Sequence, residues 1–384
     1  MIEIHSKLPA QGVTIFSIMT AMAQRLNALN LAQGFPDFAA PPALLDALSQ
    51  ATLAGFNQYP SGDGLLPLRE QVARLFSRRD QLTPDPVTEI TITPGATIGI
   101  FCVIQAIIHA DDEVIIFDPS YDSYAPSIQL VGGKAIHIAL NTADFSVDWN
   151  QVKDAITDKT RMVIVNTPHN PTGAIWSRQD WLNLIALIQD KNIIVLSDEV
   201  YEHLIYDHEK HLSALTFPEL RDRSFVVGSF GKTFHVTGWK TGYCVASPQL
   251  MRVFRQIYQF ANFCGVTPIQ MALANYMQQH PEHITGLSRF YQDKRDLFIS
   301  GLKDSKFNLV ASKGTFFQNL DYSAIRPDLN DREMCQYLAE EHKIVAIPVS
   351  VFYQHPPEKL HLIRFCFAKK DETLIQAAKI LTLV

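Results

Sequence analysis

Hydrophobic runs in the middle of the chain switch repeatedly between a strand-like and a helix-like period. Short β-type runs occupy residues 89–95, 112–119, 134–140, 161–168 and 192–199. Helical patterns interrupt them, including the apolar stretch 96–109 and the segment from Arg178 to Asp190. Strands that alternate with helices predict a mainly parallel sheet covered by helices on both faces.

Two further β-type runs follow closely on one another, SFVVGSF at 224–230 and GYCVAS at 242–247. The segment between them is too short for the helical crossover that a parallel pair needs, so this pair is predicted to be antiparallel. The predicted fold is therefore an α/β sheet of about seven strands with one strand reversed.

The two ends of the chain show a different pattern. Helical periods cover 16–28 and 43–54 and dominate after Ala261 through residue 302, and a strand-like stretch covers 307–322. A helix at 331–343, short strands within 344–350 and 361–368, and a final helix from about Asp371 complete the chain. This mixture predicts a smaller α+β domain. The expected division is a large domain at 46–283 and a small domain made of 1–45 and 284–384.

Composition narrows the possible functions. The chain has 384 residues, 47% of them hydrophobic and 19% charged, and a net charge of −6. These values are typical of a folded protein with a large core, and they exclude intrinsic disorder. A nucleic-acid partner is not expected because there is no basic excess. An enzyme that acts on small molecules is the better interpretation.

The five cysteines are odd in number, scattered, and without any CxxC pair. Most stand in apolar surroundings, so buried free thiols are expected rather than disulfides or metal ligands. The start of the chain has no basic segment followed by an apolar block, and no apolar run approaches membrane-spanning length. A cytoplasmic protein without membrane insertion or a metal site is the expectation.

Two lysines, Lys232 and Lys240, are predicted to lie on the loop between the two antiparallel strands. A lysine at the end of a buried strand loses hydration of its ammonium, which lowers its pKa and frees the amine to attack a carbonyl. A nucleotide-phosphate loop at Gly231–Thr233 is excluded, because Val226 stands where that loop requires glycine. The alternative of an ordinary surface lysine at a loop tip stays open at this point.

Other polar residues also follow the predicted strands. In an open α/β sheet, ligands bind outside the carboxyl ends of the strands. The residues collected there are Gly95, Ala96, Thr97, Tyr121, Asn166, Asn170, Asp198, Tyr201, Ser229 and Lys232. Free N–H groups at a helix that starts after Gly95 could hold a phosphate, although such a glycine can also be a simple turn. Asp198 ends an apolar strand and needs a cationic or hydrogen-bonding partner, which could equally be structural.

One ligand would use all of these groups. Pyridoxal phosphate needs a phosphate cup, an amine for its aldehyde, a carboxylate on its ring nitrogen, donors to its phenolic oxygen and an aromatic ring over its face. Asn170 and Tyr201 could donate to the phenolic oxygen, and Tyr121 could stack on the ring. Each of these side chains could instead belong to a turn or to the packed core.

Five motifs carry a family resemblance: PGA at 94–96, NTPHNPTG at 166–173, SDEVYEHLIY at 197–206, SFGKTFHVTGWKTGY at 229–243 and RFCFA at 364–368. In their order they resemble the class I pyridoxal-phosphate aminotransferases of fold type I, over nearly the whole chain. QGFPDF at 33–38 and the IRFCFAK ending are similar to the kynurenine aminotransferase / glutamine transaminase K group.

The resemblance implies a role for each matching residue. Lys232 would bond to the cofactor aldehyde, Asp198 would pair with the pyridine nitrogen, and Asn170 and Tyr201 would contact the phenolic oxygen. The phosphate would be held by Gly95, Ala96, Thr97, Ser229 and Lys240. Many relatives have an arginine where this chain has Lys240, which implies a point-charge contact rather than a fork.

The resemblance also extends to the substrate and to a partner subunit. Arg364 would clamp the substrate α-carboxylate, a task suited to the guanidinium fork, and the segments around Phe16 and Gly34 would lie near the substrate. Tyr59 would reach the cofactor phosphate of a neighbouring subunit, which implies a homodimer with shared active sites.

The implied activity is transfer of an amino group from an amino acid to a 2-oxo acid by a ping-pong mechanism. The strand-end set offers no arginine besides Arg364 for a side-chain carboxylate. The candidate pocket segments offer apolar and aromatic side chains instead, namely Phe16, Ile18, Tyr59, Tyr121 and Tyr124. Large uncharged donors of the methionine, aromatic, glutamine or kynurenine type are therefore expected. The alternative is a β-lyase of the same fold acting on cysteine conjugates or cystathionine. A cofactor-binding regulator is disfavoured, because the chain has no spare basic domain.

Overall fold

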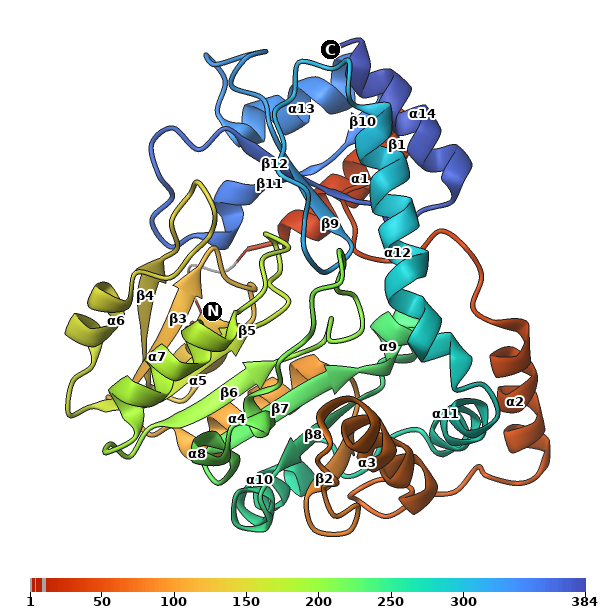
Figure 1. The fold of residues 1–384 in the computed structure, drawn as a ribbon, viewed down its shortest axis with the longest axis vertical. Coiled ribbons are helices and arrows are strands. Elements are labelled where there is room, and N and C mark those ends of the chain that lie inside the picture. Colours follow the sequence, from red (N-terminus) through yellow and green to blue (C-terminus); the bar gives the residue numbers. More distant parts are fainter. Residues whose placement is uncertain (1, 4, 9–11) are drawn as a thin grey trace.

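A computed structural model describes residues 2–3, 5–8 and 12–384. Its main feature is a seven-stranded sheet (Figure 1). The strand order is β2 (Ile90–Thr93), β8 (Gly242–Ala246), β7 (Ser224–Ser229), β6 (Ile194–Asp198), β5 (Thr160–Asn166), β3 (Glu113–Asp118) and β4 (Lys134–Ala139). β8 runs antiparallel to both of its neighbours, whereas the pairs from β7 to β4 are parallel. The predicted sheet with one reversed strand is therefore confirmed.

Helices cover both faces of this sheet because its strands are apolar on both sides. On β5, Val163 and Val165 pack into one core cluster, and Met162 and Ile164 pack into the opposite one. The first cluster contains α3 (Leu66–Asp80), α7 (Arg178–Ile188) and α11 (Thr267–Gln279). The second contains α4 (Ala96–Ile107), α5 (Tyr124–Leu130) and α10 (Pro248–Ala261). The shorter helices α6 (Trp149–Ala155) and α8 (Pro218–Arg221) also belong to this region, and α2 (Pro42–Leu53) packs on α11.

A second core unites the two ends of the chain. β9 (Phe317–Asp321), β12 (Leu362–Cys366) and β11 (Ile347–Pro348) form an antiparallel sheet, and β1 (Leu29–Asn30) pairs in parallel with β10 (Ile344–Val345). The helices here are α1 (Ile15–Leu26), α12 (Glu282–Gly301), α13 (Asp331–Glu341) and α14 (Asp371–Thr382). Met19 and Leu31 share one buried cluster with residues beyond 284, so α1 and β1 lie beside the C-terminal elements in the upper part of Figure 1.

Several boundaries differ from the predicted ones. Residue 283 lies inside α12, so the predicted domain boundary falls within a continuous helix; the division itself stays a prediction. Only 317–321 of the strand-like stretch 307–322 forms a strand, since Ser312–Gly314 turns the chain before it. α1 ends at Leu26 because Asn27 adopts a left-handed backbone with φ 48°. No helix was predicted at α3 or α10.

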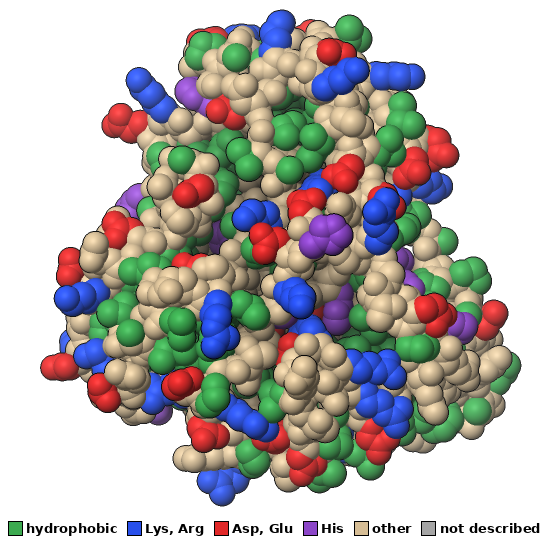
Figure 2. Space-filling model, in the orientation of Figure 1, with side chains coloured by type: hydrophobic (Ala, Val, Ile, Leu, Met, Phe, Trp, Pro, Cys, Tyr) green, Lys and Arg blue, Asp and Glu red, His purple; other side chains and the backbone are tan. Residues whose placement is uncertain are grey.

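The surface and the cysteines carry less information about function. On the face shown in Figure 2, acidic and basic side chains are interspersed and form no extended basic patch. All five cysteines are free thiols, four of them buried and Cys264 half-buried. None of the helices in the described part of the chain is both long and apolar enough to cross a membrane.

Candidate active site

A cavity of about 250 Å³ lies at the carboxyl ends of the central strands, against β9 and β12 of the small sheet. Its walls contain every residue to which the family resemblance assigns a role, except Tyr59. The lining residues are Phe16, Gly34, Gly95, Ala96, Thr97, Ile100, Tyr121, Asn166, Asn170, Asp198, Val200, Tyr201, Ser229, Gly231, Lys232, Thr237, Lys240, Thr241, Phe317 and Arg364. Residues that are far apart in the sequence thus share one cavity.

Lys232 lies in a helical turn, α9 (Phe230–Thr233), so the predicted loop position is wrong for this residue. The turn forms because Phe230 and Phe234, four residues apart, both bury their rings in the core. Lys232 Nζ donates to the carbonyl oxygen of Gly34 at 3.1 Å. Removal of water lowers the Lys232 pKa to about 8, and the positive charges of Lys240 and Arg364 add to this effect.

Asp198 ends β6 with its carboxylate buried. Its Oδ2 accepts a hydrogen bond from the hydroxyl of Tyr124 at 2.5 Å, and its Oδ1 accepts one from the Val200 N–H at 3.3 Å. Burial raises the Asp198 pKa to about 6, although these hydrogen bonds and the charge of Lys232 oppose the shift. In the described part of the chain the carboxylate therefore has hydrogen-bonding partners but no cation in direct contact, so a positively charged ligand beside it would be favoured.

One end of the cavity has the features of an anion site. α4 starts directly after Gly95, whose φ of 80° suits glycine, and the first N–H groups of a helix have no partner within the helix. A Cβ on Gly95 would lie 3.4 Å from Lys240 Nζ, so the missing side chain lets the ammonium approach the helix start. Ser229 ends β7 beside them. Lys240 follows a 3-10 turn, η2 (Thr237–Trp239), and is itself left-handed with φ 47°.

Arg364 is a buried cation that lacks a carboxylate partner among the described residues. It is 1% exposed and lies in the middle of β12. Its Nη1 donates to Asn170 Oδ1 at 2.7 Å and its Nη2 donates to the Ala32 carbonyl at 3.3 Å, whereas its buried Nε has no partner. Burial lowers the Arg364 pKa to about 10.

Aromatic rings surround this guanidinium. Its carbon lies 3.9 Å from the ring centre of Phe317, 5.0 Å from that of Phe352 and 5.6 Å from that of Phe16. Such cation–π contacts partly replace the lost hydration. They provide no acceptor for the remaining N–H groups, so the site can bind an anionic ligand there.

Three further predicted residues lie between these groups. Asn170 is buried in a turn fixed by the bond from its N–H to Asn166 Oδ1 at 2.8 Å. Since its Oδ1 faces Arg364, its amide nitrogen is left to donate into the cavity. The Tyr201 hydroxyl is buried, which raises the pKa of this phenol well above its ordinary value. Tyr121 packs edge-on against Tyr124 with ring centres 5.6 Å apart.

Two residues of the expected pocket lie elsewhere. Tyr59 is 81% exposed and packs edge-on against Phe263, outside the cavity. Ile18 was expected to line the pocket together with Phe16, but it is 44% exposed. Two residues correspond to about 200° of rotation in an α-helix, so Phe16 and Ile18 cannot face the same cavity.

Sequence reasoning also missed functional positions. The sequence places Tyr124 only in the wall of the substrate pocket, whereas in the structure its side chain is buried and its hydroxyl donates to Asp198. Phe317 was not identified, since an aromatic residue in an apolar strand usually signals core packing. Ile100, Val200, Gly231, Thr237 and Thr241 were also not predicted. The Ser and Thr residues of the SFGKTFHVTGWKTGY motif were the available signal for Thr237 and Thr241.

The comparisons with known proteins agree with this geometry. A family model described as aminotransferase class I and II matches residues 27–381. The chain is 45% identical over 376 residues to methionine aminotransferase of Escherichia coli (strain K12), covering 98% of this chain and 97% of that protein. It is 32% identical over 386 residues to kynurenine–oxoglutarate transaminase 1 of Rattus norvegicus, covering 92% and 91%.

A solved structure shows the same fold. The crystal structure of YbdL from Escherichia coli, reported with a methionine aminotransferase function, matches with a TM-score of 0.98 at 44% identity, covering 100% of both chains. The chain belongs to the class I and II aminotransferases. It is therefore a transaminase of fold type I, as the motifs predicted, and its substrates are amino acids and 2-oxo acids. The family and the fold imply pyridoxal phosphate. The relatives described here are transaminases, which gives no support to the β-lyase alternative.

Proposed function

We propose that the enzyme transfers the amino group of a large, uncharged L-amino acid, of the methionine, aromatic, glutamine or kynurenine type, to a 2-oxo acid by a ping-pong mechanism. The observation that carries this proposal is Arg364. It is the single arginine among the described lining residues, and its unpartnered Nε lies within an aromatic cage. One guanidinium suits one α-carboxylate, and the described lining residues include no second one for an acidic side chain.

The residues present fit pyridoxal phosphate. The start of α4 and the ammonium of Lys240 suit a phosphate. The raised pKa of Asp198 is what is expected of a buried carboxylate that would pair with a cationic ring nitrogen. Asn170 and Tyr201 would hold the phenolic oxygen, and Tyr121 would lie over the ring. When bound, this cofactor supplies an aldehyde that condenses with amines and a ring that withdraws electrons from the substrate Cα.

Lys232 has the properties of the base that moves the substrate proton. Its pKa of about 8 leaves part of the amine neutral near neutral pH, and a neutral amine can accept a proton from Cα. Gly34 O holds Nζ at the cavity wall at 3.1 Å. A proton held on Nζ could then be returned to a neighbouring atom, which is what amino transfer requires.

The substrate end of the cavity is mostly apolar. Phe16, Phe317 and the guanidinium of Arg364 form one wall. The polar atoms of Arg364 fix the α-carboxylate, and the rings offer apolar contact to the side chain. A methionine or aromatic side chain gains from this contact, whereas an aspartate side chain would be buried without a cation. The named substrates of the relatives support the same preference.

The proposal includes a homodimer and a two-part subunit. Tyr59, Phe260 and Phe263 are large side chains exposed by 81%, 87% and 56% in the single chain. Tyr59 and Phe263 pack edge-on against each other, and exposed aromatic residues suit a subunit interface. Tyr59 in such an interface would reach the partner's phosphate site. The segments 46–283, and 1–45 with 284–384, would form the large and small domains.

The test is a panel of amino donors with one common oxo acid. The purified protein with added pyridoxal phosphate should show a cofactor absorbance that changes on addition of methionine, and methionine and phenylalanine should exceed aspartate in kcat/KM. A higher kcat/KM for aspartate would contradict the substrate proposal. Release of ammonia and pyruvate from a cysteine conjugate, faster than amino transfer, would instead favour the lyase.

A further inference from the structure

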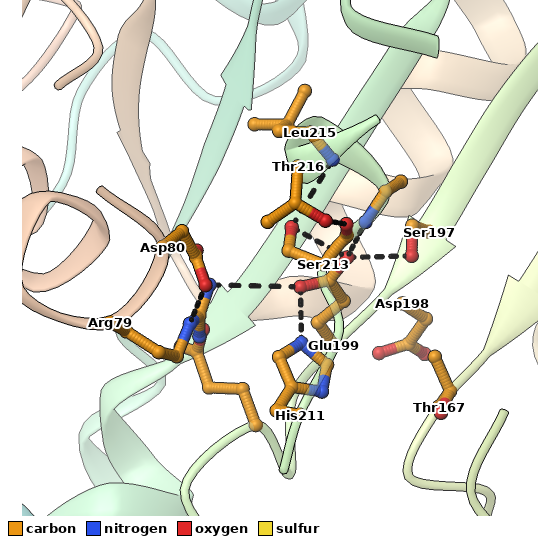
Figure 3. Close-up of polar contacts among 12 residues, drawn as sticks. Arg79, Asp80, Thr167, Ser197, Asp198, Glu199, His211, Ser213, Leu215 and Thr216 are labelled. Atoms are coloured by element: carbon orange, nitrogen blue, oxygen red, sulfur yellow. Dashed lines mark hydrogen bonds and ion pairs between the residues drawn. The ribbon is translucent and has the colours of Figure 1, made fainter. Parts of the chain in front are cut away.

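Two carboxylates with no role in the proposed reaction are buried behind the cavity. Asp198 and Tyr201 line the cavity, whereas Glu199 and Glu202 do not, and they are 0% and 5% exposed. Figure 3 shows Glu199 directed away from Asp198, toward Arg79 and Asp80. Successive residues at a strand end face opposite sides, which explains how adjacent acids come to lie in different surroundings. A buried carboxylate is costly, so its partners indicate what it does.

The Glu199 side chain is held on both of its oxygens. Oε1 accepts hydrogen bonds from Ser197 Oγ at 2.8 Å, Ser213 Oγ at 3.0 Å and the Ala214 N–H at 3.0 Å. Oε2 lies 2.6 Å from His211 Nε2. The Glu199 N–H also donates to the Val227 carbonyl on β7 at 2.9 Å. The residue directly after Asp198 is therefore fixed by its backbone and by its side chain.

The same network connects this strand end to α3 and β8. Arg79 at the end of α3 donates to Glu202 and to Asp80, and its Nη2 lies 4.0 Å from Glu199 Oε2. The hydroxyl of Tyr243 on β8 donates to the second oxygen of Glu202. The group comprises three carboxylates, one guanidinium and the imidazoles of His203 and His211. Glu199, Glu202 and His211 have the spacing of metal ligands, but Arg79 already supplies their positive charge.

Resting on the proposed function, we propose that Glu199 is a positioning residue for Asp198. Its hydrogen bonds fix the strand end that presents Asp198, and its negative charge favours a positive charge on the ring nitrogen that Asp198 would contact. Asp198 is fixed on its other side as well, because its carbonyl accepts from Asn166 Nδ2 at 2.9 Å and from the Thr167 N–H at 3.1 Å. Of the three residues that fix Asp198 in place, Glu199 is the one that carries a charge.

Glu199→Gln tests the charge while keeping the shape. The glutamine oxygen can still accept from Ser197, Ser213 and Ala214, so the melting temperature of the cofactor-free protein should change by only about 3 °C. In the holoenzyme, kcat should fall by roughly tenfold, and KM for methionine should stay within about twofold because Arg364 is untouched. The pH midpoint of the cofactor absorbance should move down by roughly 0.5 units, since a negative charge near a cation is lost.

The matched control is Glu209→Gln, which removes the same charge from an exposed pair with Lys313; it should leave kcat and the midpoint unchanged. Unchanged kcat and midpoint in Glu199→Gln would overturn the inference. A lower melting temperature with normal kcat in the folded fraction would also overturn it, because that result indicates a structural role only.

If Glu199→Gln does not fold, Ser213→Ala provides the test. This variant removes one hydrogen-bond donor to Glu199, and an unaltered kcat would contradict the positioning role. The wild-type enzyme separates the two proposals, since a wild type without amino transfer refutes the proposed function itself.

Discussion

Two buried charged clusters lie on opposite sides of the end of β6, and they differ in how their charges are compensated. Behind the strand, Arg79 contacts Glu202 and Asp80, which raises its pKa above the ordinary value and lowers the Glu202 pKa to about 2 against the cost of burial. In the cavity, burial raises the Asp198 pKa to about 6 and lowers the pKa of Lys232 to about 8 and of Arg364 to about 10. In the rear cluster a guanidinium contacts two of the carboxylates, although burial still raises the Asp80 pKa. Among the described residues, no counter-ion contacts Asp198, Lys232 or Arg364. Titratable groups of a ligand site are expected to show such pKa shifts.

The largest effect is expected at Lys232. Lys232→Ala removes the only proposed proton carrier, so turnover should fall by at least about 10²- to 10⁴-fold. The variant should still bind pyridoxal phosphate, because the phosphate site at α4 and Lys240 is intact. Stopped-flow absorbance and a steady-state assay measure both properties. Undiminished turnover would refute the role of this lysine.

Replacing Arg79 should mainly lower stability, because this residue does not line the cavity. Arg79→Gln leaves Glu202 and Asp80 buried without their cation, a change that typically costs about 3–5 kcal/mol. The free energy of unfolding should fall by this order, while KM for methionine stays unchanged in the folded enzyme. Urea unfolding followed by kinetics on the folded fraction makes the measurement. Arg78→Gln, one residue earlier in the same helix, serves as the control.

Opposite pH dependences are expected for the two acids. In the cofactor-free protein, the Asp198 pKa is raised from 3.8 to about 6, so its contribution to stability is present below pH 4 and is lost as the pH rises through 6. Asp198→Asn should therefore stabilise this form at pH 8 by up to about 3 kcal/mol and leave it unchanged at pH 4. Thermal melts at the two pH values measure the difference.

The contribution of Glu202 to stability is expected to have the opposite pH dependence. Its pKa is lowered from 4.5 to about 2, so its contribution is present above pH 4.5 and is lost as the pH falls toward 2. Glu202→Gln should destabilise the protein at pH 7 and make little difference at pH 2. Equal behaviour of the two variants would mean that the two clusters do not differ in charge compensation. Bound cofactor should abolish the gain from Asp198→Asn, because a ring cation would then pair with Asp198.

The agreement between sequence and structure follows from the geometry of parallel sheets. The carboxyl ends of parallel strands share one edge, so residues that follow different strands can be expected in one site without knowledge of any contact. Asn170, Asp198 and Lys232 are in the cavity for this reason. Local patterns were also sufficient for the reversed strand β8, since its connection to β7 is short.

Other features depend on contacts between distant segments, which local patterns do not encode. The bond from Tyr124 to Asp198 spans 74 residues, and the pair of Arg79 and Glu202 spans 123. Tyr124 stands at the start of a helix and Arg79 in the charged last turn of another, and neither local sequence differs from an ordinary helix end. The expected role of Tyr59 needs a second chain. The sequence thus indicates which side chains follow the strands. The folded structure is needed to show which contacts hold these side chains in place.

A smaller effect is expected at Arg364 when the charge is retained. Arg364→Lys replaces the guanidinium fork with a single ammonium, and loss of a charged hydrogen bond is worth about 1.5–3 kcal/mol. The kcat/KM for methionine should therefore fall by roughly 10- to 150-fold. The effect should appear mainly in KM. A lower melting temperature with constant KM would instead make Arg364 a structural cation like Arg79.

The smallest effect concerns Phe16, which tests whether the apolar wall selects the substrate. Its ring lies 5.6 Å from the Arg364 guanidinium and lines the cavity, whereas Ile18 on the same helix is 44% exposed. Phe16→Ala removes apolar contact with the substrate side chain, worth about 1–2 kcal/mol, so KM for phenylalanine and methionine should rise by roughly 5- to 30-fold. KM for alanine should change little, because its methyl group does not reach this wall. Ile18→Ala should leave all three values unchanged, and a similar rise of KM for all three donors in Phe16→Ala would show that Phe16 supports Arg364 rather than selecting the side chain.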